Sequence, residues 1–114
     1  MNNKIIYTSI SEIEPQLTTH LIGKKYVLVN SNHCESNIMQ IAKGVLEVNE
    51  VIEQHLHPTM EEFYFFLSGK AEMWINNKFY NCSSETLIKV PANQNHFIKP
   101  ISKVQFLYWS VAVK

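Results

Sequence analysis

Three histidines and one glutamate stand at spacings that suit a metal site. His55 and His57 are separated by one residue, Glu62 follows five residues later, and a lone His96 comes after Pro91. At pH 7 a neutral imidazole offers a nitrogen lone pair, and a carboxylate offers an anionic oxygen. Four such donors can hold a divalent first-row transition metal and still leave coordination positions open. These residues therefore predict a metal site at which a second molecule can bind.

β-Strands can bring these four side chains together. Successive side chains of a strand point to opposite faces, so a strand through 51–57 places His55 and His57 on one face. A turn after His57 can return the chain antiparallel, with Glu62 entering the next strand. His96 would come from a later hairpin, as the first residue of its strand. The sequence thus predicts that three separate segments converge on the site.

Aromatic side chains are candidates for the wall of a pocket beside the site. If Glu62 faces inward, the alternation places Tyr64 and Phe66 on the same face, and we predict that these two and Tyr108 line the pocket. Aromatic residues of a small β protein can equally be ordinary core. Any general base would have to come from the pocket, from Tyr64 or Tyr108. Glu61 is predicted to face outward, because adjacent strand residues face opposite ways.

Other polar residues allow fewer conclusions. Three polar residues in predicted strands could hold a substrate carboxylate or carbonyl, namely Gln40, Lys89 and Gln105. His20 and His33 are interpreted as histidines that are solvated or satisfied by a hydrogen bond.

The strand pattern extends along the whole chain. Short runs rich in β-branched and aromatic residues alternate with Asn, Ser, Gly and Pro, which is typical of an all-β sandwich or barrel. The predicted strands are 26–29, 37–48, 51–57, 62–67, 71–75, 78–80, 86–90, 96–99 and 104–113. Asn76-Asn77 predicts a tight hairpin, since Asn tolerates positive φ. Only Ser11–Leu17 indicates a helical turn, with Ser11 as N-cap and Glu14 in a capping box, outside the β core.

Length and charge restrict the class of protein. The 114 residues, 46% of them apolar, suffice for one domain with one core. Ten basic and ten acidic residues give a formal charge of zero, and without a like-charged block we expect no nucleic acid or membrane partner. The chain has no signal-peptide pattern and no apolar run near ~20 residues, so we expect a cytoplasmic protein. Cys34 and Cys82 show no CxxC spacing and are expected to be free thiols.

The candidate ligands lie in motifs that resemble those of the cupin family. The first cupin motif, G-x5-H-x-H-x4-E-x6-G, and the second, G-x5-P-x-G-x2-H-x3-N, are matched at His55, His57, Glu62, Gly69, Pro91 and His96. The other four motif positions differ, with Asn49, Glu85 and Asn93 in place of glycines and Pro100 in place of the final asparagine. Asn adopts left-handed backbone angles readily, so two of these changes are mild, whereas Glu85 suggests a different turn.

The resemblance implies a fold and a cofactor. The fold would be a double-stranded β-helix, a small barrel of jelly-roll type, over residues 26–114. Residues 1–25 would be an N-terminal extension that packs on the barrel. By the same resemblance, His55, His57, Glu62 and His96 would bind one divalent transition metal, which in cupins is usually Mn, Fe, Ni, Zn or Cu.

The resemblance also allows two classes of function. The first is a metalloenzyme that acts on a small oxygen-rich molecule, as a dioxygenase, a decarboxylase or a sugar or keto-acid isomerase. The alternative is a non-catalytic module that binds a small ligand or metal. Phe63, Phe65 and Trp74 are candidates for an exposed apolar sheet face, and we expect a second subunit to cover it in a homodimer.

Overall fold

The structure is a computed structural model that describes residues 4–18, 20 and 22–113. These residues form strands and two short 3-10 helices, η1 (Ile10–Glu12) and η2 (Ser31–His33), and contain no α-helix. The strands are β1 (Gln16–Leu17), β2 (Lys24–Asn30), β3 (Ile38–Leu46), β4 (Ile52–His55), β5 (Met60–Ser68), β6 (Ala71–Ile75), β7 (Lys78–Cys82), β8 (Leu87–Val90), β9 (His96–Pro100) and β10 (Val104–Ala112). The all-β prediction and the nine predicted strands are confirmed, with boundaries shifted by a few residues.

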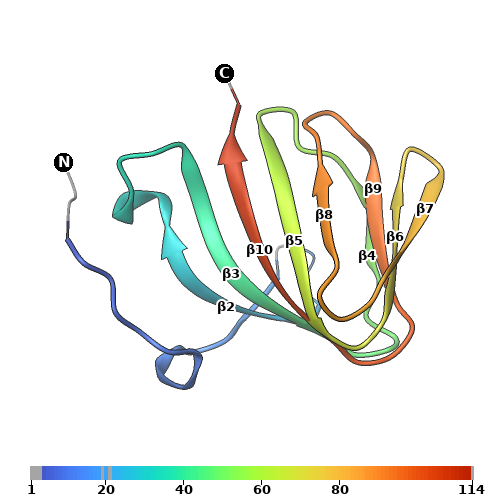
Figure 1. Cartoon of the computed structure of the whole chain (residues 1–114), viewed down its shortest axis with the longest axis horizontal. Helices are drawn as coiled ribbons and strands as arrows, with labels where there is room; N and C mark the ends of the chain where they lie inside the picture. Colours follow the sequence, from blue (N-terminus) through green and yellow to red (C-terminus); the bar gives the residue numbers. More distant parts are fainter. Residues whose placement is uncertain (1–3, 19, 21, 114) are drawn as a thin grey trace.

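The strands form two antiparallel sheets. The first has six strands in the order β1-β2-β3-β10-β5-β8, and the second has four in the order β4-β9-β6-β7. Figure 1 shows the second sheet to the right of the first, with both sheets curving toward each other at the bottom of the view. The arrangement is the predicted jelly-roll barrel.

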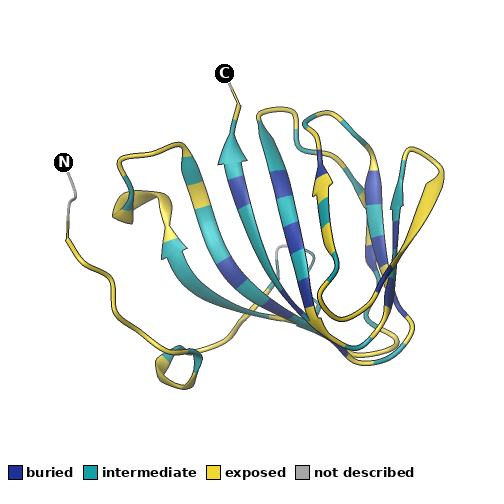
Figure 2. Cartoon of the chain, viewed as in Figure 1, coloured by how far each residue is buried: buried dark blue, intermediate teal, exposed yellow. Residues whose placement is uncertain are grey.

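The core lies between the inner faces of the two sheets. Along β5 the buried residues are Glu62, Tyr64 and Phe66, and the residues between them are less buried. Figure 2 shows the same alternation as dark bands along β5 and β10. A period of two is expected where one face of a sheet packs on a core and the other faces outward. Glu62 therefore faces the interior of the barrel, beside the core.

Residues with positive φ form several of the turns. The predicted hairpin between β6 and β7 is confirmed, with φ of 48° at Asn76 and 67° at Asn77. Asn93 also has a positive φ, of 65°, whereas Asn49 does not. Glu85, which suggested a different turn, has a φ of 67°. Its backbone therefore keeps the left-handed conformation that favours glycine.

The N-terminal segment differs from the prediction. The 3-10 helix η1 has Ser9 rather than Ser11 at its N-cap, without a capping side chain, so the predicted capping box is wrong. Gln16–Leu17 is not helical but pairs with β2 as β1. Pro15 explains the change, because proline restricts the preceding residue to extended conformations and lacks an N–H. Of the predicted extension 1–25, residues 1–3, 19 and 21 lie outside the described residues.

Cys34 and Cys82 are free thiols, as expected, although Cys82 is buried at the end of β7 rather than in a polar turn. Among the helices of the described residues, none is long and apolar enough to span a membrane.

Candidate metal centre

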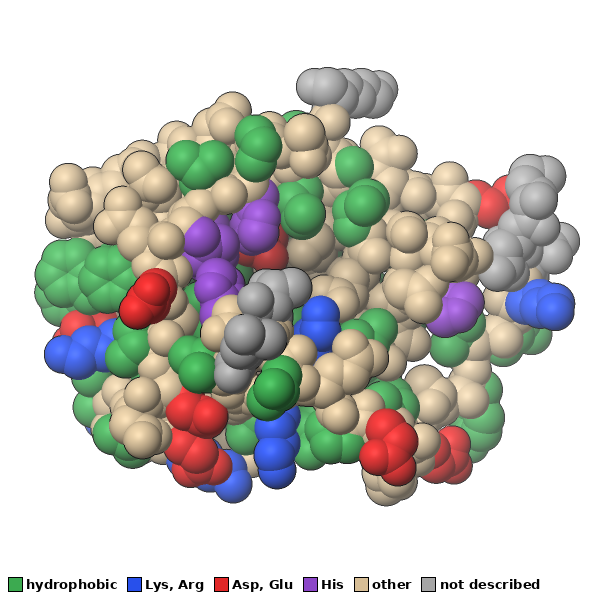
Figure 3. All heavy atoms as spheres, turned by 180° about the vertical axis from the view of Figure 1, so that it is seen from behind, with side chains coloured by type: hydrophobic (Ala, Val, Ile, Leu, Met, Phe, Trp, Pro, Cys, Tyr) green, Lys and Arg blue, Asp and Glu red, His purple; other side chains and the backbone are tan. Residues whose placement is uncertain are grey.

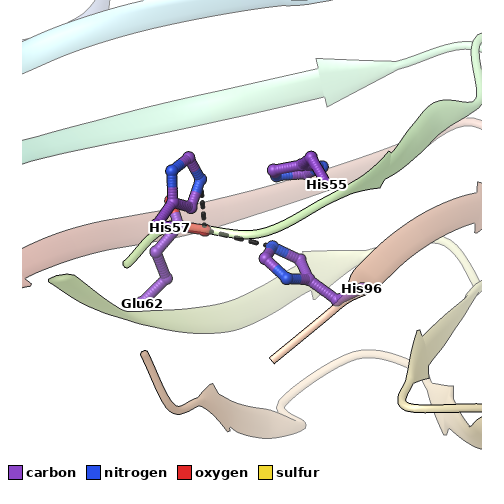
Figure 4. Close-up of side chains that lie close together, drawn as sticks. All are labelled: His55, His57, Glu62 and His96. Carbon is purple, nitrogen blue, oxygen red and sulfur yellow. Dashed lines mark ion pairs between the residues drawn. The ribbon is translucent and has the colours of Figure 1, made fainter. Parts of the chain in front are cut away.

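The four predicted ligands converge at one end of the barrel. His55 ends β4, His96 begins β9, and the two residues are direct partners in the antiparallel pair. His57 lies in the loop after β4, not inside the strand as predicted, and Glu62 enters from β5. One candidate ligand atom from each residue lies within 4.8 Å of all the others. Figure 4 shows the rings of His57 and His96 directed at the Glu62 carboxylate, with His55 beside them.

Backbone carbonyls orient two of the imidazoles. His55 Nδ1 lies 2.8 Å from the carbonyl oxygen of Glu53, and His96 Nδ1 lies 2.9 Å from that of Gln94. A carbonyl oxygen only accepts, so each Nδ1 carries the proton and donates it. The Nε2 atom of each neutral ring then carries a lone pair, which is the form that binds a metal.

The Nε2 atom of His96 is the least satisfied polar atom of the site. It is buried and has no hydrogen-bond partner. It lies 3.3 Å from Glu62 Oε1, and His57 Nε2 lies 3.4 Å from the same oxygen. With the His96 proton on Nδ1, a lone pair faces a carboxylate oxygen, which is unfavourable unless a cation lies between them. The donor set and this unpaired atom fit a metal ion.

Neighbouring hydroxyl groups hold the carboxylate of Glu62. Tyr64 donates to Oε1 at 2.9 Å, and Ser110 donates to Oε2 at 3.3 Å. Burial by itself would raise the pKa of Glu62, but the neighbouring His57 and His96 side chains and the hydrogen bond from Tyr64 outweigh it and lower that pKa below its ordinary value. Glu62 is therefore an anion at neutral pH.

The histidines and tyrosines near Glu62 differ in the direction of their pKa shifts. Burial lowers the pKa of His55 to about 4, so this ring is neutral at pH 7. The hydrogen bond with Glu62 raises the pKa of His57. Burial and nearby Glu62 raise the pKa of Tyr64 well above its ordinary value and that of Tyr108 to about 12. Both tyrosines therefore keep their protons and act as hydrogen-bond donors rather than bases at neutral pH.

A cavity of about 160 Å³ opens beside the four residues. Tyr64 and Tyr108, two of the three residues predicted to line a pocket, are part of its wall. Phe66 is not part of the wall, because its fully buried side chain packs in the core against Phe106, with ring centroids 5.3 Å apart. Figure 3 shows several histidine side chains gathered on this face of the molecule, with an acidic side chain recessed among them.

The three polar residues that could hold a substrate carboxylate or carbonyl lie in different surroundings. Gln40 lines the cavity, whereas Lys89 forms an ion pair with Glu61 at 3.8 Å and Gln105 borders a different groove. Glu61 is not one of the residues lining the cavity, although Glu62 is.

Sequence reasoning missed several residues of the cavity. His20 lines it, with its ring centroid 4.5 Å from that of His55, although no spacing links it to the motifs. Lys25 lines it from β2. Ser110 could have been found, because the alternation along 104–113 places it on the same face as Tyr108.

Comparisons with known proteins agree with the fold. A family profile described as a cupin domain matches residues 43–110. An uncharacterized protein of Methanocaldococcus jannaschii is 27% identical over 103 residues, which are 89% of this chain and 80% of that protein.

Solved structures resemble the chain at lower identity. A predicted oxalate decarboxylase of Thermotoga maritima has a TM-score of 0.86 and 16% identity, covering 94% of this chain and 99% of that chain. The polyketide cyclase RemF of Streptomyces resistomycificus has a TM-score of 0.81 and 11% identity, covering 95% of this chain and 80% of that chain. At these identities the likeness shows a shared fold.

Proposed function

The chain belongs to the cupin domain family, and on that premise we propose that it is a metal-dependent enzyme acting on a small oxygen-rich molecule. Its ligands would be His55, His57, Glu62 and His96, which together can hold one metal ion. The observation that carries the proposal is the buried, unpaired Nε2 of His96 facing the Glu62 carboxylate. When bound, Mn, Fe, Ni, Zn or Cu would supply Lewis acidity or, if redox-active, oxygen chemistry.

The names of two similar structures support this substrate class. One is a predicted oxalate decarboxylase and the other a polyketide cyclase. Oxalate and polyketides are both rich in carbonyl or carboxyl oxygen. We infer a reaction of the decarboxylase, dioxygenase or sugar or keto-acid isomerase type.

The residues of the chain have separate roles in this proposal. The carbonyls of Glu53 and Gln94 fix the rings of His55 and His96, so that each presents its Nε2 atom. Tyr64 and Ser110 hold Glu62 as an anion. Tyr108 stacks on Tyr64, with ring centroids 5.8 Å apart, and adds a protonated hydroxyl to the cavity wall. This wall binds and orients a small ligand and excludes water from one side of it.

The proposal also includes the domain bounds, the class of ligand and the location of the protein. Residues 26–114 would form the barrel domain, and residues 1–25 an extension, of which β1 pairs with β2. The balanced charge supports a small-molecule ligand rather than nucleic acid or a membrane, and we propose a cytoplasmic location.

Metal content tests the proposal directly. Untagged protein expressed with added Mn, Fe, Ni, Zn and Cu would be analysed by inductively coupled plasma mass spectrometry, with Glu62→Ala, His96→Ala and the control Glu61→Ala. Glu61 is the adjacent carboxylate and pairs with Lys89. We expect about one metal per chain in the wild type and in the control, and loss of metal in the other two variants.

Two results would contradict this expectation. A wild type without stoichiometric metal would favour the alternative, a module that binds a small ligand without catalysis. Full metal content in both site variants, with folding checked by circular dichroism, would exclude these residues as the ligands.

A further inference from the structure

We propose that the cavity selects organic acids that carry a second anionic group, and that Lys25 binds this group at the end of the cavity away from the metal ligands. This inference rests on the proposed function, because it assumes that the other end of the acid binds the metal. It assigns a specificity role to Lys25.

Lys25 is a half-buried lysine whose charge is not neutralised by a neighbour. It lies in β2 and lines the cavity. Its Nζ donates to Oε1 of Gln40 at 3.3 Å, and within the described part of the chain it has no ion pair. An ammonium group that lines a cavity with only a neutral amide as partner is able to bind an anion.

The strand register separates Lys25 from the metal ligands. Gln40 is opposite Ser110 in the β3–β10 pair, and Ser110 is opposite Glu62 in the β10–β5 pair. Glu62 is thus two strands away from Gln40, and strands lie about 4.8 Å apart, so the two backbones are separated by roughly 10 Å. The Lys25 ammonium contacts Gln40 and so enters the cavity from the β2–β3 side, whereas Glu62 enters it from β5.

Hydrogen-bonding groups connect the two ends. Gln40 accepts a hydrogen bond from Lys25, and its side chain is near enough to Tyr108 to lower the pKa of that hydroxyl, against the larger effect of burial. Tyr108 stacks on Tyr64, whose hydroxyl group donates to Glu62. The wall between the ends is therefore polar at intervals and aromatic between them, which suits a short carbon chain with oxygen at both ends.

The charge and size of the cavity agree with this ligand. Its described lining contains two lysines, Lys24 and Lys25, but one carboxylate, Glu62. Lys24 is exposed and also borders another groove, so Lys25 is the half-buried cation available to an anion in the cavity. The volume of about 160 Å³ corresponds to roughly five water molecules at about 30 Å³ each, and pockets for drug-sized ligands are larger, about 300–1,000 Å³. A short-chain acid is the class that fits.

A matched pair of acids tests the proposal. 2-Oxoglutarate and 2-oxopentanoate have the same five-carbon chain and the same 2-oxo acid group for the metal, but only the first has a distal carboxylate. Their affinities for the full chain loaded with Zn²⁺, which has no redox chemistry, would be measured by calorimetry at low salt. The variants are Lys25→Met, which keeps the apolar stem, and the control Lys43→Met, a lysine of the same sheet that borders a different groove.

We expect the wild type and Lys43→Met to bind 2-oxoglutarate at least about tenfold more tightly than 2-oxopentanoate. Lys25→Met should lose this preference while keeping its metal content and its affinity for 2-oxopentanoate. The preference should also shrink at high salt, as for any contact between partly exposed charges.

Failure of the role of Lys25 and failure of the proposed function give different results. Metal-loaded wild type that binds neither acid, or shows no preference, or a Lys25→Met variant that keeps the preference, would overturn the role of Lys25. Protein that takes up no metal, yet binds 2-oxoglutarate in a manner that depends on Lys25, would overturn the proposed function and leave the anion site standing.

Discussion

Glu62 is the residue around which the candidate site is organised. Its side chain is buried, two imidazole nitrogens lie within 3.4 Å of Oε1, and two hydroxyl groups donate to it. A buried anion is costly unless such groups satisfy it. The hydrogen bonds from Tyr64 and Ser110 also fix the direction of the carboxylate, as outer partners of metal ligands commonly do.

His57 should control how acid affects metal binding. Its pKa is raised by the hydrogen bond with Glu62, so as pH falls it takes a proton before His55, whose pKa is lowered by burial to about 4 and which competes little above pH 5. A metal must displace the proton from His57 below that raised pKa. We expect the affinity for Zn²⁺ to be constant above the pKa of His57 and to fall by about tenfold per pH unit below that pKa.

Competition with a chelator between pH 5.5 and 8.5 would measure this dependence. The variant His57→Gln should bind more weakly but with a shallower dependence on pH, because the titrating group is gone. An unchanged slope in the variant would show that another group takes up the proton.

At the scale of the elements, the turns place the strands, and two turn residues have similar backbone angles but different space for a side chain. Gly69 has a φ of 80°, and a Cβ there would lie 2.0 Å from the carbonyl oxygen of Lys103. Glu85 has a similar φ of 67° but is exposed. The first turn needs glycine for space, whereas the second carries a side chain at a conformational cost.

Glu85→Gly should therefore stabilise the protein. A left-handed conformation costs a residue with Cβ about 1–2 kcal/mol, and the greater freedom of glycine in the unfolded chain cancels part of the gain. We expect the free energy of unfolding in urea to rise by about 0.5–1 kcal/mol. Glu85→Ala is the control and should give no such gain, and Gly69→Ala should lower stability by more than about 2 kcal/mol. Equal stability of the glycine and alanine variants at position 85 would contradict the argument.

At the scale of the whole molecule, the outer face of the six-stranded sheet carries an apolar patch over β5, β8 and β10, beside the Lys89–Glu61 ion pair. Phe63 stacks on Trp109 with ring centroids 5.5 Å apart, and Leu87, which is opposite Phe65 in the β5–β8 pair, is 57% exposed. Trp74 lies on the second sheet, where it stacks on Phe97 at 5.6 Å and on Phe79 at 5.2 Å. Phe63, Phe65 and Leu87 thus lie on a face that a second copy of the chain could cover.

We predict that the chain forms a homodimer through this face. Light scattering coupled to size exclusion should give twice the mass of the 13.3 kDa chain. Leu87→Glu should shift the mass toward the monomer, because a buried carboxylate without a partner is costly. Ile101→Glu is the control, at an exposed residue between β9 and β10. A wild type that elutes as a monomer would refute the prediction.

The sequence alone was sufficient for features that depend on local pattern. Alternation predicted the strands, and the tolerance of Asn for positive φ predicted the hairpin at Asn76-Asn77. The spacing of His55, His57, Glu62 and His96 indicated which residues to bring together, because each lies at or near the end of a strand and neighbouring strands must pair.

Only the tertiary structure decided what surrounds those residues. Phe66 belongs to the core although it shares a face with Tyr64, because it packs against Phe106, its partner in the β5–β10 pair, and Phe106 rather than Phe66 lines the cavity. His20 and Lys25 reach the cavity through an outer strand and the segment before it. Alternation says which face a side chain takes, but not which distant strand it meets. The pairing of strands far apart in the chain settles that, and it depends on burial of the whole core at once.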